Sequence, residues 1–502
     1  MANDQSALLS RRETLTDSLS EQPYDLHLYL ERATVYLDLD YPDLASGDAY
    51  RALLLSDDVR DDSAEFHEQA VAAFSESEFR RDGEGDIEER VGAASLRAFQ
   101  ILASSLCLVG CLKSAYGFCE RGLGVDPENA ELRGMKARIL ERGAARLKRD
   151  VAPEDLPDWG LAPREIYPWN THDPVEDRYF DEALAAVNAE LRDMGPKCVV
   201  KATELRMMRD DPSTSSGSSG ESTITQFGLF AREDISPGEA VLKEYSLLTA
   251  NNRFKDQLCD ACGEELPRLG DAEGESVSCP ECYDTVFCSQ FCFDEAQAKY
   301  HPALCEKDVD AIGKDPQHSE ADERLHMLLL ARVLAMAAHQ DVHPLEIMEV
   351  KYIWGDFSPV APPRPEAERE ESPPPGWTLP FSFEYSVKMP MHILEKMDVD
   401  VYETLAHCDV WVVNSLYAKF RGTASARKNP HDGRPEVAAV HPFWCLANHD
   451  CDPNVTWEWG GRMTLWAREE KVVAGGPGGI KKGEEIMNHY CDVDLPVQER
   501  RE

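Results

Sequence analysis

Apolar and small residues in the N-terminal part of the chain recur at the spacing of paired helices. Between residues 24 and 58 they fall at offsets that suit two antiparallel helices, and the same offsets return between residues 103 and 127. Ala45 and Ala115 hold corresponding positions seventy residues apart, close to two periods of about 34 residues. The pattern predicts a helical-repeat domain over residues 23–150, and residues 1–22 are expected to be disordered.

The pattern changes after residue 150. An acidic amphipathic helix is expected over residues 176–194, and short strands over 198–202, 225–231 and 240–242, with a tight turn at Pro237-Gly238 between the last two. A Leu-, Met- and Ala-rich helical segment is expected over 320–353. The Ser/Gly-rich run 210–222 and the Pro/Glu-rich run 358–375 are typical of flexible loops.

The C-terminal part contains a hairpin that follows a polar loop. Residues 455–459 and 462–466 alternate in character around Gly460-Gly461, which indicates two antiparallel strands and a tight turn. The preceding loop, 448–454, packs Asn, His, Asp, Cys and Pro into seven residues. Polar groups concentrated where one strand ends and another begins are typical of binding sites. An Asx-rich turn without function is the alternative interpretation.

Charge narrows the class of partner. Asp and Glu number 93 against 52 Lys and Arg, a net charge of −41, so direct nucleic-acid binding is not expected, and a basic peptide or protein is the preferred partner. The N-terminus has no basic region followed by an apolar run, and the apolar stretch 327–338 is interrupted by Arg332. No signal peptide or membrane span is expected.

Cysteine spacing predicts two metal sites. Seven of the 15 cysteines fall between Cys259 and Cys305. With one histidine they form four ligand pairs of two-residue or three-residue spacing, which suit two tetrahedral zinc ions: Cys259, Cys262, Cys279, Cys282, Cys288, Cys292, His301 and Cys305. Spacing alone leaves open whether the pairs combine in chain order or interleave. Cys107, Cys111 and Cys119 lie among apolar residues and are expected to be core thiols.

The loop at 448–454 resembles a known enzyme signature. Asn448-His449-x-Cys451-x-Pro453-Asn454, followed by Gly483-Glu484-Glu485-Ile486 and Tyr490, resembles the motif of SET-domain lysine methyltransferases. The eight metal ligands resemble the MYND zinc finger, in which ligand pairs interleave. The N-terminal helices resemble tetratricopeptide repeats. Together these resemblances imply an α+β multidomain protein: a helical-repeat domain, then a β-rich SET fold with an inserted MYND finger and a helical insertion.

The resemblance also implies where the parts begin and end. The expected parts are a disordered N-terminus (1–22), a helical domain (23–150), a linker and helix (151–194), the first SET part (195–258), the MYND finger (259–305), a helical insertion (306–410) and the second SET part (411–495). Family members continue into a cysteine-rich post-SET tail that binds a third zinc together with a cysteine at the position of Cys451. This tail is expected to be absent here, with weak activity as the consequence.

The resemblance implies roles for individual residues. The cofactor would be S-adenosylmethionine, bound by Asn448 and His449 at its adenine and amino-acid ends. Residues 226–228 hold the place where the family usually has Gly-x-Gly-Leu, with Gln226 in place of the first glycine and Phe227 before Gly228. Asn414 resembles the Asn of an Asn-Ser-Phe strand that contacts the cofactor, although a sheet-edge Asn with satisfied hydrogen bonds is the alternative.

The catalytic residue implied by the resemblance is Tyr490, placed beside the channel for the target lysine. Carried over from the MYND finger, Cys259, Cys262, Cys288 and Cys292 would hold one structural zinc and Cys279, Cys282, His301 and Cys305 the other. The leading hypothesis is a protein-lysine N-methyltransferase that acts on histone or other basic protein lysines in the nucleus or cytoplasm. The alternative is a non-catalytic scaffold whose helical repeats and finger bind protein partners.

Overall fold

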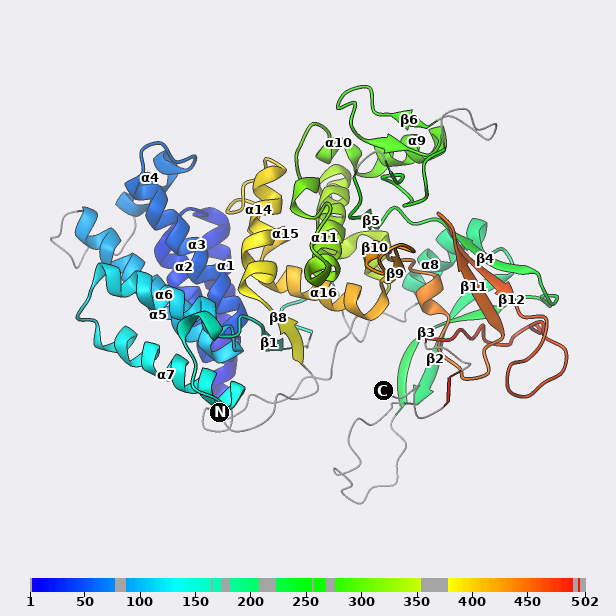
Figure 1. The fold of residues 1–502 in the computed structure, drawn as a ribbon, viewed down its shortest axis with the longest axis horizontal. Helices are drawn as coiled ribbons and strands as arrows, with labels where there is room; N and C mark the ends of the chain where they lie inside the picture. Colours follow the sequence, from blue (N-terminus) through cyan, green and yellow to red (C-terminus); the bar gives the residue numbers. More distant parts are fainter. Residues whose placement is uncertain are drawn as a thin grey trace, which may run out of the picture. The chain divides into compact units, whose positions relative to one another are not determined.

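The computed structural model describes residues 2–76, 87–163, 166–172, 181–206, 223–254, 257–267, 276–353, 378–490 and 495–496. Contacts within the chain divide it into two compact units, residues 1–167 with 357–415 and residues 168–356 with 416–502. The fold is α+β, as expected: the first unit is mostly helical and the second carries small antiparallel sheets (Figure 1). The loops expected at 210–222 and 358–375 lie outside the described residues.

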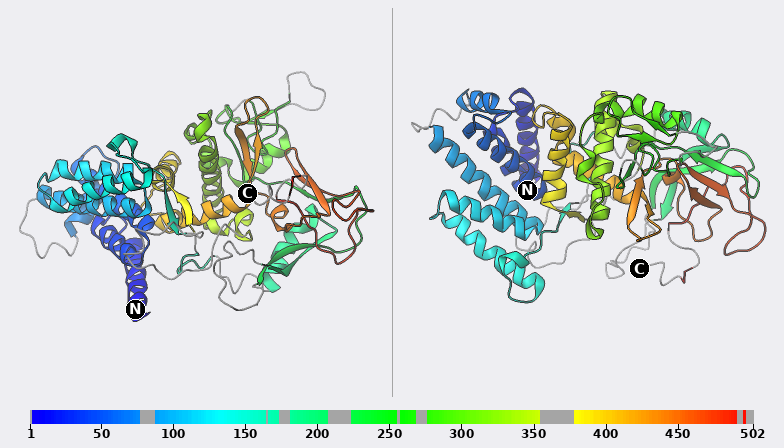
Figure 2. Two further views of the ribbon diagram at one scale, coloured as in Figure 1. Left: turned by 60° about the horizontal axis from the view of Figure 1, so that its bottom comes forward. Right: turned by 45° about the horizontal axis from the view of Figure 1, so that its top comes forward.

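The part of the first unit described before residue 148 is formed by helices α1 (Ala2–Glu21), α2 (Leu26–Asp38), α3 (Pro42–Arg60), α4 (His67–Glu76), α5 (Ile87–Val109), α6 (Leu112–Val125) and α7 (Ala130–Leu147). Helices α5, α6 and α7 lie side by side in succession (Figure 2). The small residues of the repeat-like pattern, including Ala33, Ala45, Ala103 and Ala115, are fully buried. They let neighbouring helices approach closely, which confirms the helical N-terminal region expected from the sequence.

Helix α1 corrects one expectation. The described residues before Gln22 form a helix and are not disordered, and Leu15 and Leu19 are buried. The sequence gives little sign of this because the helix has only a narrow apolar stripe among polar residues.

Helix α5 is long and apolar enough to cross a membrane, judged by length and composition alone. The apolar stretch considered in the sequence is a different one, residues 327–338. In the structure 61% of the apolar window of α5 is buried. Its exposure is that of a core helix packed between α3 and α6.

The residues from 378 to 415 complete the first unit. They comprise β8 (Thr378–Phe381), the π-helical turn η7 (Glu384–Lys388), α14 (Met389–Lys396), α15 (Leu405–Cys408) and the start of α16 (Val410–Thr423). Strand β8 pairs with β1 (Gly160–Pro163), which follows the short turn η2 (Pro153–Asp155). Part of the expected helical insertion (306–410) therefore packs with the N-terminal helices.

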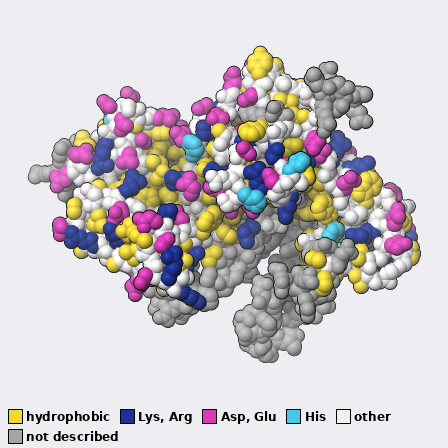
Figure 3. Space-filling model, viewed as in Figure 1, with side chains coloured by type: hydrophobic (Ala, Val, Ile, Leu, Met, Phe, Trp, Pro, Cys, Tyr) yellow, Lys and Arg dark blue, Asp and Glu magenta, His cyan; other side chains and the backbone are white. Residues whose placement is uncertain are grey.

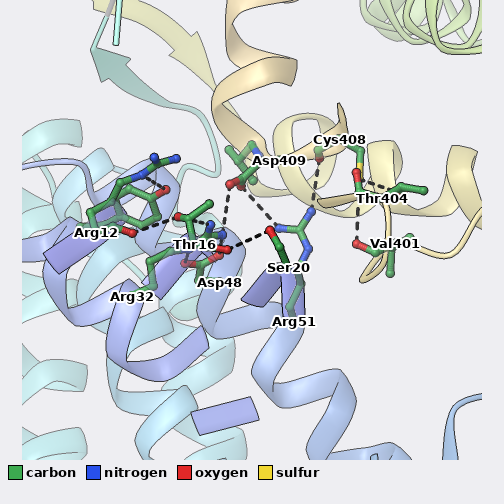
Figure 4. A network of polar contacts seen from close by, with 12 residues as sticks. Arg12, Thr16, Ser20, Arg32, Asp48, Arg51, Val401, Thr404, Cys408 and Asp409 are labelled. Atoms are coloured by element: carbon green, nitrogen blue, oxygen red, sulfur yellow. Dashed lines mark hydrogen bonds and ion pairs between the residues drawn. The ribbon is translucent and has the colours of Figure 1, made fainter. Parts of the chain in front are cut away.

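A buried ionic network fastens this segment to the N-terminal helices (Figure 4). The Arg32 guanidinium donates to both carboxylate oxygens of Asp48 at 2.7 and 2.6 Å. It also lies 3.1 Å from Asp409, which forms a second ion pair with Arg51 at 3.8 Å. All four side chains are nearly or fully buried. Buried charges are tolerated because each is matched by an opposite charge, and removing one partner costs about 3–5 kcal/mol.

The described residues of the second unit form two three-stranded sheets and two hairpins. Its strands are β2 (Cys198–Arg206), β3 (Thr223–Ala231), β4 (Ala240–Glu244), β5 (Thr249–Asn251), β6 (Val277–Ser278), β7 (Val286–Phe287), β9 (Ser425–Lys428), β10 (Pro435–Ala439), β11 (Val455–Trp459) and β12 (Met463–Ala467). The sheet orders are β5-β10-β9 and β11-β12-β4, and the hairpins are β2-β3 and β6-β7. The expected hairpin after the polar loop is confirmed, with Gly461 at φ 66° in its turn.

The helices of the second unit flank these strands. They are α8 (Asp181–Met194), α9 (Gln290–Lys299), α10 (His301–Leu304), α11 (Ala321–Gln340), α12 (Met348–Lys351) and the end of α16, with 3-10 turns η4 (Asp310–Ile312), η5 (His318–Glu320), η6 (Pro344–Glu346) and η8 (Trp444–Leu446). One hydrophobic core joins α8 to strands β2, β3, β4, β11 and β12 and to Ile486. This core supports the loop that begins at Asn448.

Candidate functional site

Two segments that the sequence places far apart lie side by side in the second unit. A parallel β-bridge joins His449 to Asn488. The Asn488 amide donates to the carbonyl of Asn448 at 2.8 Å, and the Asp450 amide donates to the carbonyl of Asn488 at 2.9 Å. The loop after residue 447 is therefore held by backbone hydrogen bonds to the segment that ends at Tyr490.

The side chain of Asn448 connects this pair of segments to strand β3. Its amide nitrogen donates to Glu485 Oε1 at 2.7 Å and to the carbonyl of Phe227 at 3.3 Å. Asn448 is only 5% exposed. Three segments from distant parts of the chain therefore meet at one side chain.

Gly228 makes this meeting possible. A Cβ at this position would lie 2.6 Å from Glu485 Oε1, 2.9 Å from Thr203 Cγ2 and 3.0 Å from a ring carbon of Phe230. No side chain fits there without moving a neighbour. Gln226 lies two residues earlier on β3, opposite Thr203.

His449 and Tyr490 are joined directly. The backbone amide of Tyr490 donates to Nδ1 of His449 at 3.0 Å, so the neutral imidazole carries its proton on Nε2. That nitrogen lies 3.7 Å from the sulfur of Cys451. The rings of His449 and Tyr490 are 5.4 Å apart.

The hydroxyl of Tyr490 points inward although 62% of the residue is exposed. It donates to the carbonyl of Ala447 at 3.2 Å. Burial raises the pKa of this phenol above its usual range, and the nearby Cys445 thiol and Glu485 carboxylate raise it further. The Tyr490 hydroxyl therefore remains neutral, and its oxygen can still accept a hydrogen bond.

Asn414 is held by side-chain hydrogen bonds within the first unit. It belongs to the first unit, where its amide donates to Asp43 at 2.8 Å and to the Tyr167 hydroxyl at 3.1 Å. It lies on helix α16 and not on the expected strand. The run around it is apolar on nearly every side, so neither a period of 2 nor one of 3.6 stands out. Its hydrogen bonds match the alternative of a satisfied Asn, and its contact with the cofactor stays a prediction.

Two glutamates of the site had no role in the sequence analysis. Glu485 lies in the Gly-Glu-Glu motif, but nothing in the sequence shows that its carboxylate meets Asn448. Glu244 ends β4 and is buried. Its oxygens accept from the backbone amides of Phe443 at 2.9 Å and Trp444 at 2.8 Å, and burial raises its pKa to about 8. It holds the turn that leads into the Asn448 loop.

The cysteine-rich segment forms two candidate metal centres. Cys259, Cys262, Cys288 and Cys292 make one group, and Cys279, Cys282, His301 and Cys305 make the other; within each, the ligand atoms lie within 4.8 Å of one another. The pairs interleave and do not combine in chain order. Sulfur atoms lie 3.7 Å apart at Cys262 and Cys288 and 3.8 Å apart at Cys279 and Cys305. Tetrahedral thiolates about 2.3 Å from a zinc ion would have nearly this separation.

The expected core thiols are buried as predicted. Cys107, Cys111 and Cys119 lie on or beside helices of the first unit and are at most 2% exposed. They belong to neither of the ligand groups found among the described residues. Burial raises the pKa of Cys111 and of Cys119 to about 12, which keeps both thiols protonated.

A buried ion pair attaches the finger to helix α11. The Arg332 guanidinium donates to Asp260 Oδ2 at 3.1 Å and lies 3.7 Å above the ring of Tyr300. The Tyr300 hydroxyl donates to the same carboxylate oxygen at 2.6 Å. Asp260 lies between ligands of one group, and Tyr300 precedes His301 of the other. One arginine therefore connects residues beside both metal centres to helix α11.

Comparison with known proteins identifies the family. Residues 226–491, more than half of the chain, match the family model described as SET domain, so the chain belongs to the SET domain family. The SET domain-containing protein SmydA-8, isoform A, of Drosophila melanogaster is 29% identical over 170 residues. This match covers 32% of the chain and 33% of the fly protein, about a third of that relative's length. The two Cys/His groups lie within the matched range and are compatible with a MYND zinc finger.

Proposed function

We propose that this protein is a protein-lysine N-methyltransferase that uses S-adenosylmethionine. The observation that carries the proposal is the meeting of Gly228, Asn448 and Glu485 beside Tyr490. The cluster combines a backbone position without room for a side chain, a buried amide and an inward-facing hydroxyl. These groups suit alignment of a substrate better than acid–base or covalent catalysis.

The residues present fit the cofactor. Asn448 keeps its side-chain carbonyl oxygen for a hydrogen-bond donor, because its nitrogen is taken up by the Glu485 carboxylate and the Phe227 carbonyl. An unpaired polar atom on a buried side chain is costly, so a ligand group that donates to this oxygen would be stabilising. When bound, S-adenosylmethionine supplies the electrophilic methyl group. His449 and the backbone of residues 226–228 are the remaining groups proposed to hold it.

Tyr490 is the proposed catalytic residue. Because its hydroxyl proton is donated to Ala447, the oxygen can accept an N–H from the target amine and turn the nitrogen lone pair toward the methyl group. A lysine amine has a pKa of about 10.4 and must be neutral to attack. Removing the ammonium from water favours the neutral form.

The proposed substrate is a lysine on a basic protein, with histone tails as one class. Acidic side chains are spread over the face shown in Figure 3, and the net charge of the chain is −41. This charge attracts basic chains by electrostatic steering. The helical N-terminal region and the finger are proposed to bind protein partners, and the proposed location is the nucleus or cytoplasm.

The two Cys/His groups are proposed to hold structural zinc. Each group offers four protein ligands, which fills a tetrahedral zinc ion and leaves no position for water. The ions would therefore fold the finger and take no part in methyl transfer.

Replacing Tyr490 tests the proposed role. Tyr490→Phe is expected to lower kcat about 100-fold, the scale of losing one hydrogen-bonding group that acts in the transition state. The dissociation constant for S-adenosylmethionine is expected to change little, because the hydroxyl acts on the amine. Single-turnover methylation of a lysine-rich protein and calorimetric titration give the two quantities.

Asn448→Ala is the complementary variant. It removes a cofactor contact and is expected to weaken cofactor binding first. If the two variants had equal effects on the dissociation constant, the assigned roles would be wrong. If the intact chain did not bind the cofactor at all, the non-catalytic scaffold would be the better description; Gln226, in the place of a family glycine, is the residue that favours it.

A further inference from the structure

The hydrogen bonds of Asn448 fix the direction of its amide. An asparagine side chain has two N–H donors and one carbonyl acceptor. Here both partners, the Glu485 carboxylate and the Phe227 carbonyl, are acceptors, so the nitrogen must face them. The carbonyl oxygen then faces the other way. This oxygen has no hydrogen-bond partner among the described residues. It is also not one of the enclosed polar atoms there, so it is accessible to a ligand.

We propose that Glu485 is a positioning residue that holds Asn448 with its carbonyl oxygen toward the cofactor, so that this point of the site recognises a hydrogen-bond donor. The inference rests on the proposed function. The ammonium group at the amino-acid end of S-adenosylmethionine is the donor that best suits a carbonyl oxygen beside a carboxylate. The charge of Glu485 acts in the same sense, because a nearby anion stabilises a cation.

Glu485 is itself held firmly. The backbone of Glu485 forms an antiparallel β-bridge with Phe230. The backbone amide of Ile486 donates to the carbonyl of Leu229 at 2.7 Å. The Asn454 side chain donates to the carbonyl of Glu485, also at 2.7 Å. The carboxylate lies where a side chain on Gly228 would be, 2.6 Å from that missing Cβ. Gly228 therefore makes room for the Glu485 carboxylate.

Glu485→Gln tests the inference with almost no change of shape. The glutamine can present its own N–H groups to Asn448, which allows the asparagine to turn its nitrogen outward. Binding is measured by calorimetry with S-adenosylmethionine, S-adenosylhomocysteine and 5′-methylthioadenosine. The first two carry the ammonium group and the third lacks the amino-acid end. We expect about 10- to 100-fold weaker binding of the first two, the scale of one charge-assisted hydrogen bond, and unchanged binding of the third.

Glu484→Gln is the matched control. The carboxylate of Glu484 accepts from the exposed backbone amide of Lys481 at 2.8 Å and does not touch Asn448. This variant is expected to bind all three ligands like the wild type. Thermal unfolding of each variant reports any loss of folding.

The outcomes separate the inference from the proposed function. Equal weakening of all three ligands by Glu485→Gln, or no weakening of any, would overturn the positioning role while leaving the methyltransferase intact. A wild-type chain that binds 5′-methylthioadenosine as tightly as S-adenosylmethionine would show that no donor is recognised at Asn448, and would overturn it as well. A wild-type chain that binds none of the three would overturn both.

Discussion

Glu244 shows how a single buried carboxylate supports the site. Both oxygens accept backbone N–H groups from the turn before Asn448, and no cation pairs with it among the contacts of the described residues. Its pKa is raised to about 8 because burial disfavours the charged form more than these two hydrogen bonds favour it. The folded protein therefore binds a proton at Glu244 over a range in which the unfolded chain does not.

This predicts a pH-dependent stability. Because the pKa is higher in the folded state, the stabilisation is fully present below the unfolded value of 4.5 and is lost as pH rises through about 8. The slope is about 1.4 kcal/mol per pH unit within that window. Glu244→Gln mimics the protonated acid and removes this dependence. The unfolding free energy of the variant minus that of the wild type is expected to grow by several kcal/mol from pH 5 to pH 8.5, as measured by urea denaturation.

Subtracting the unfolding free energy of the wild type from that of the variant removes the pH dependence that other groups, such as the metal ligands, contribute to both proteins. Glu239→Gln is the control, because Glu239 is partly exposed and pairs with Lys197. A difference between Glu244→Gln and wild type that stays constant with pH would mean that the Glu244 carboxylate ionises normally in the folded protein.

At the scale of elements, the metal finger is integrated into the second unit. Arg332 contacts residues next to ligands of both metal groups, and the hydroxyl of Tyr245, at the end of β4, donates to the ligand Cys292 at 3.5 Å. A Cβ on Gly461 in the β11-β12 turn would lie 3.4 Å from the sulfur of Cys262. Loss of metal should therefore disturb neighbouring strands as well as the finger.

Metal analysis tests the two centres. We expect two zinc ions per chain, one zinc ion for Cys279→Ser, and unfolding of the finger when a chelator removes both. Cys107→Ser is the control, because this buried thiol lies outside both ligand groups. It should keep two ions. Native mass spectrometry gives the count, and a wild-type value of zero or three would contradict the assignment.

The sequence predicts some elements well and others poorly for physical reasons. The β11-β12 hairpin is predicted nearly to the residue, because alternating side chains and Gly460-Gly461 favour one structure. Helix α16 is not, because its residues are buried on nearly every side and leave no periodicity to read. Helix α1 is also poorly predicted, for the opposite reason: few of its residues are apolar.

The candidate site divides in the same way. Asn448, His449 and Tyr490 lie in short motifs that the sequence makes visible. The contact between Glu485 and Asn448 is not visible, because it depends on three segments meeting at Gly228, more than 200 residues away in the chain. Spacing likewise left the metal pairing open, and only the folded positions of the ligands show that the pairs interleave.

At the scale of the whole molecule, distant segments are combined within each unit. The Arg32–Asp48–Asp409–Arg51 network fastens residues after the 354–377 gap to the first helices. In the second unit, residues near 228, 448 and 485 form one site, and the same unit contains the two Cys/His groups. The strongly acidic composition extends over both units and suits a basic partner.

Transfer of a labelled methyl group tests the central claim most directly. The chain is incubated with S-adenosylmethionine carrying a trideuteromethyl group and a lysine-rich basic protein, and the products are mapped by mass spectrometry. We expect the label on lysine side-chain nitrogens with the wild type and a rate about 100-fold lower with Tyr490→Phe. Cofactor binding without label on any lysine, or equal labelling by wild type and Tyr490→Phe, would contradict methyl transfer at this site.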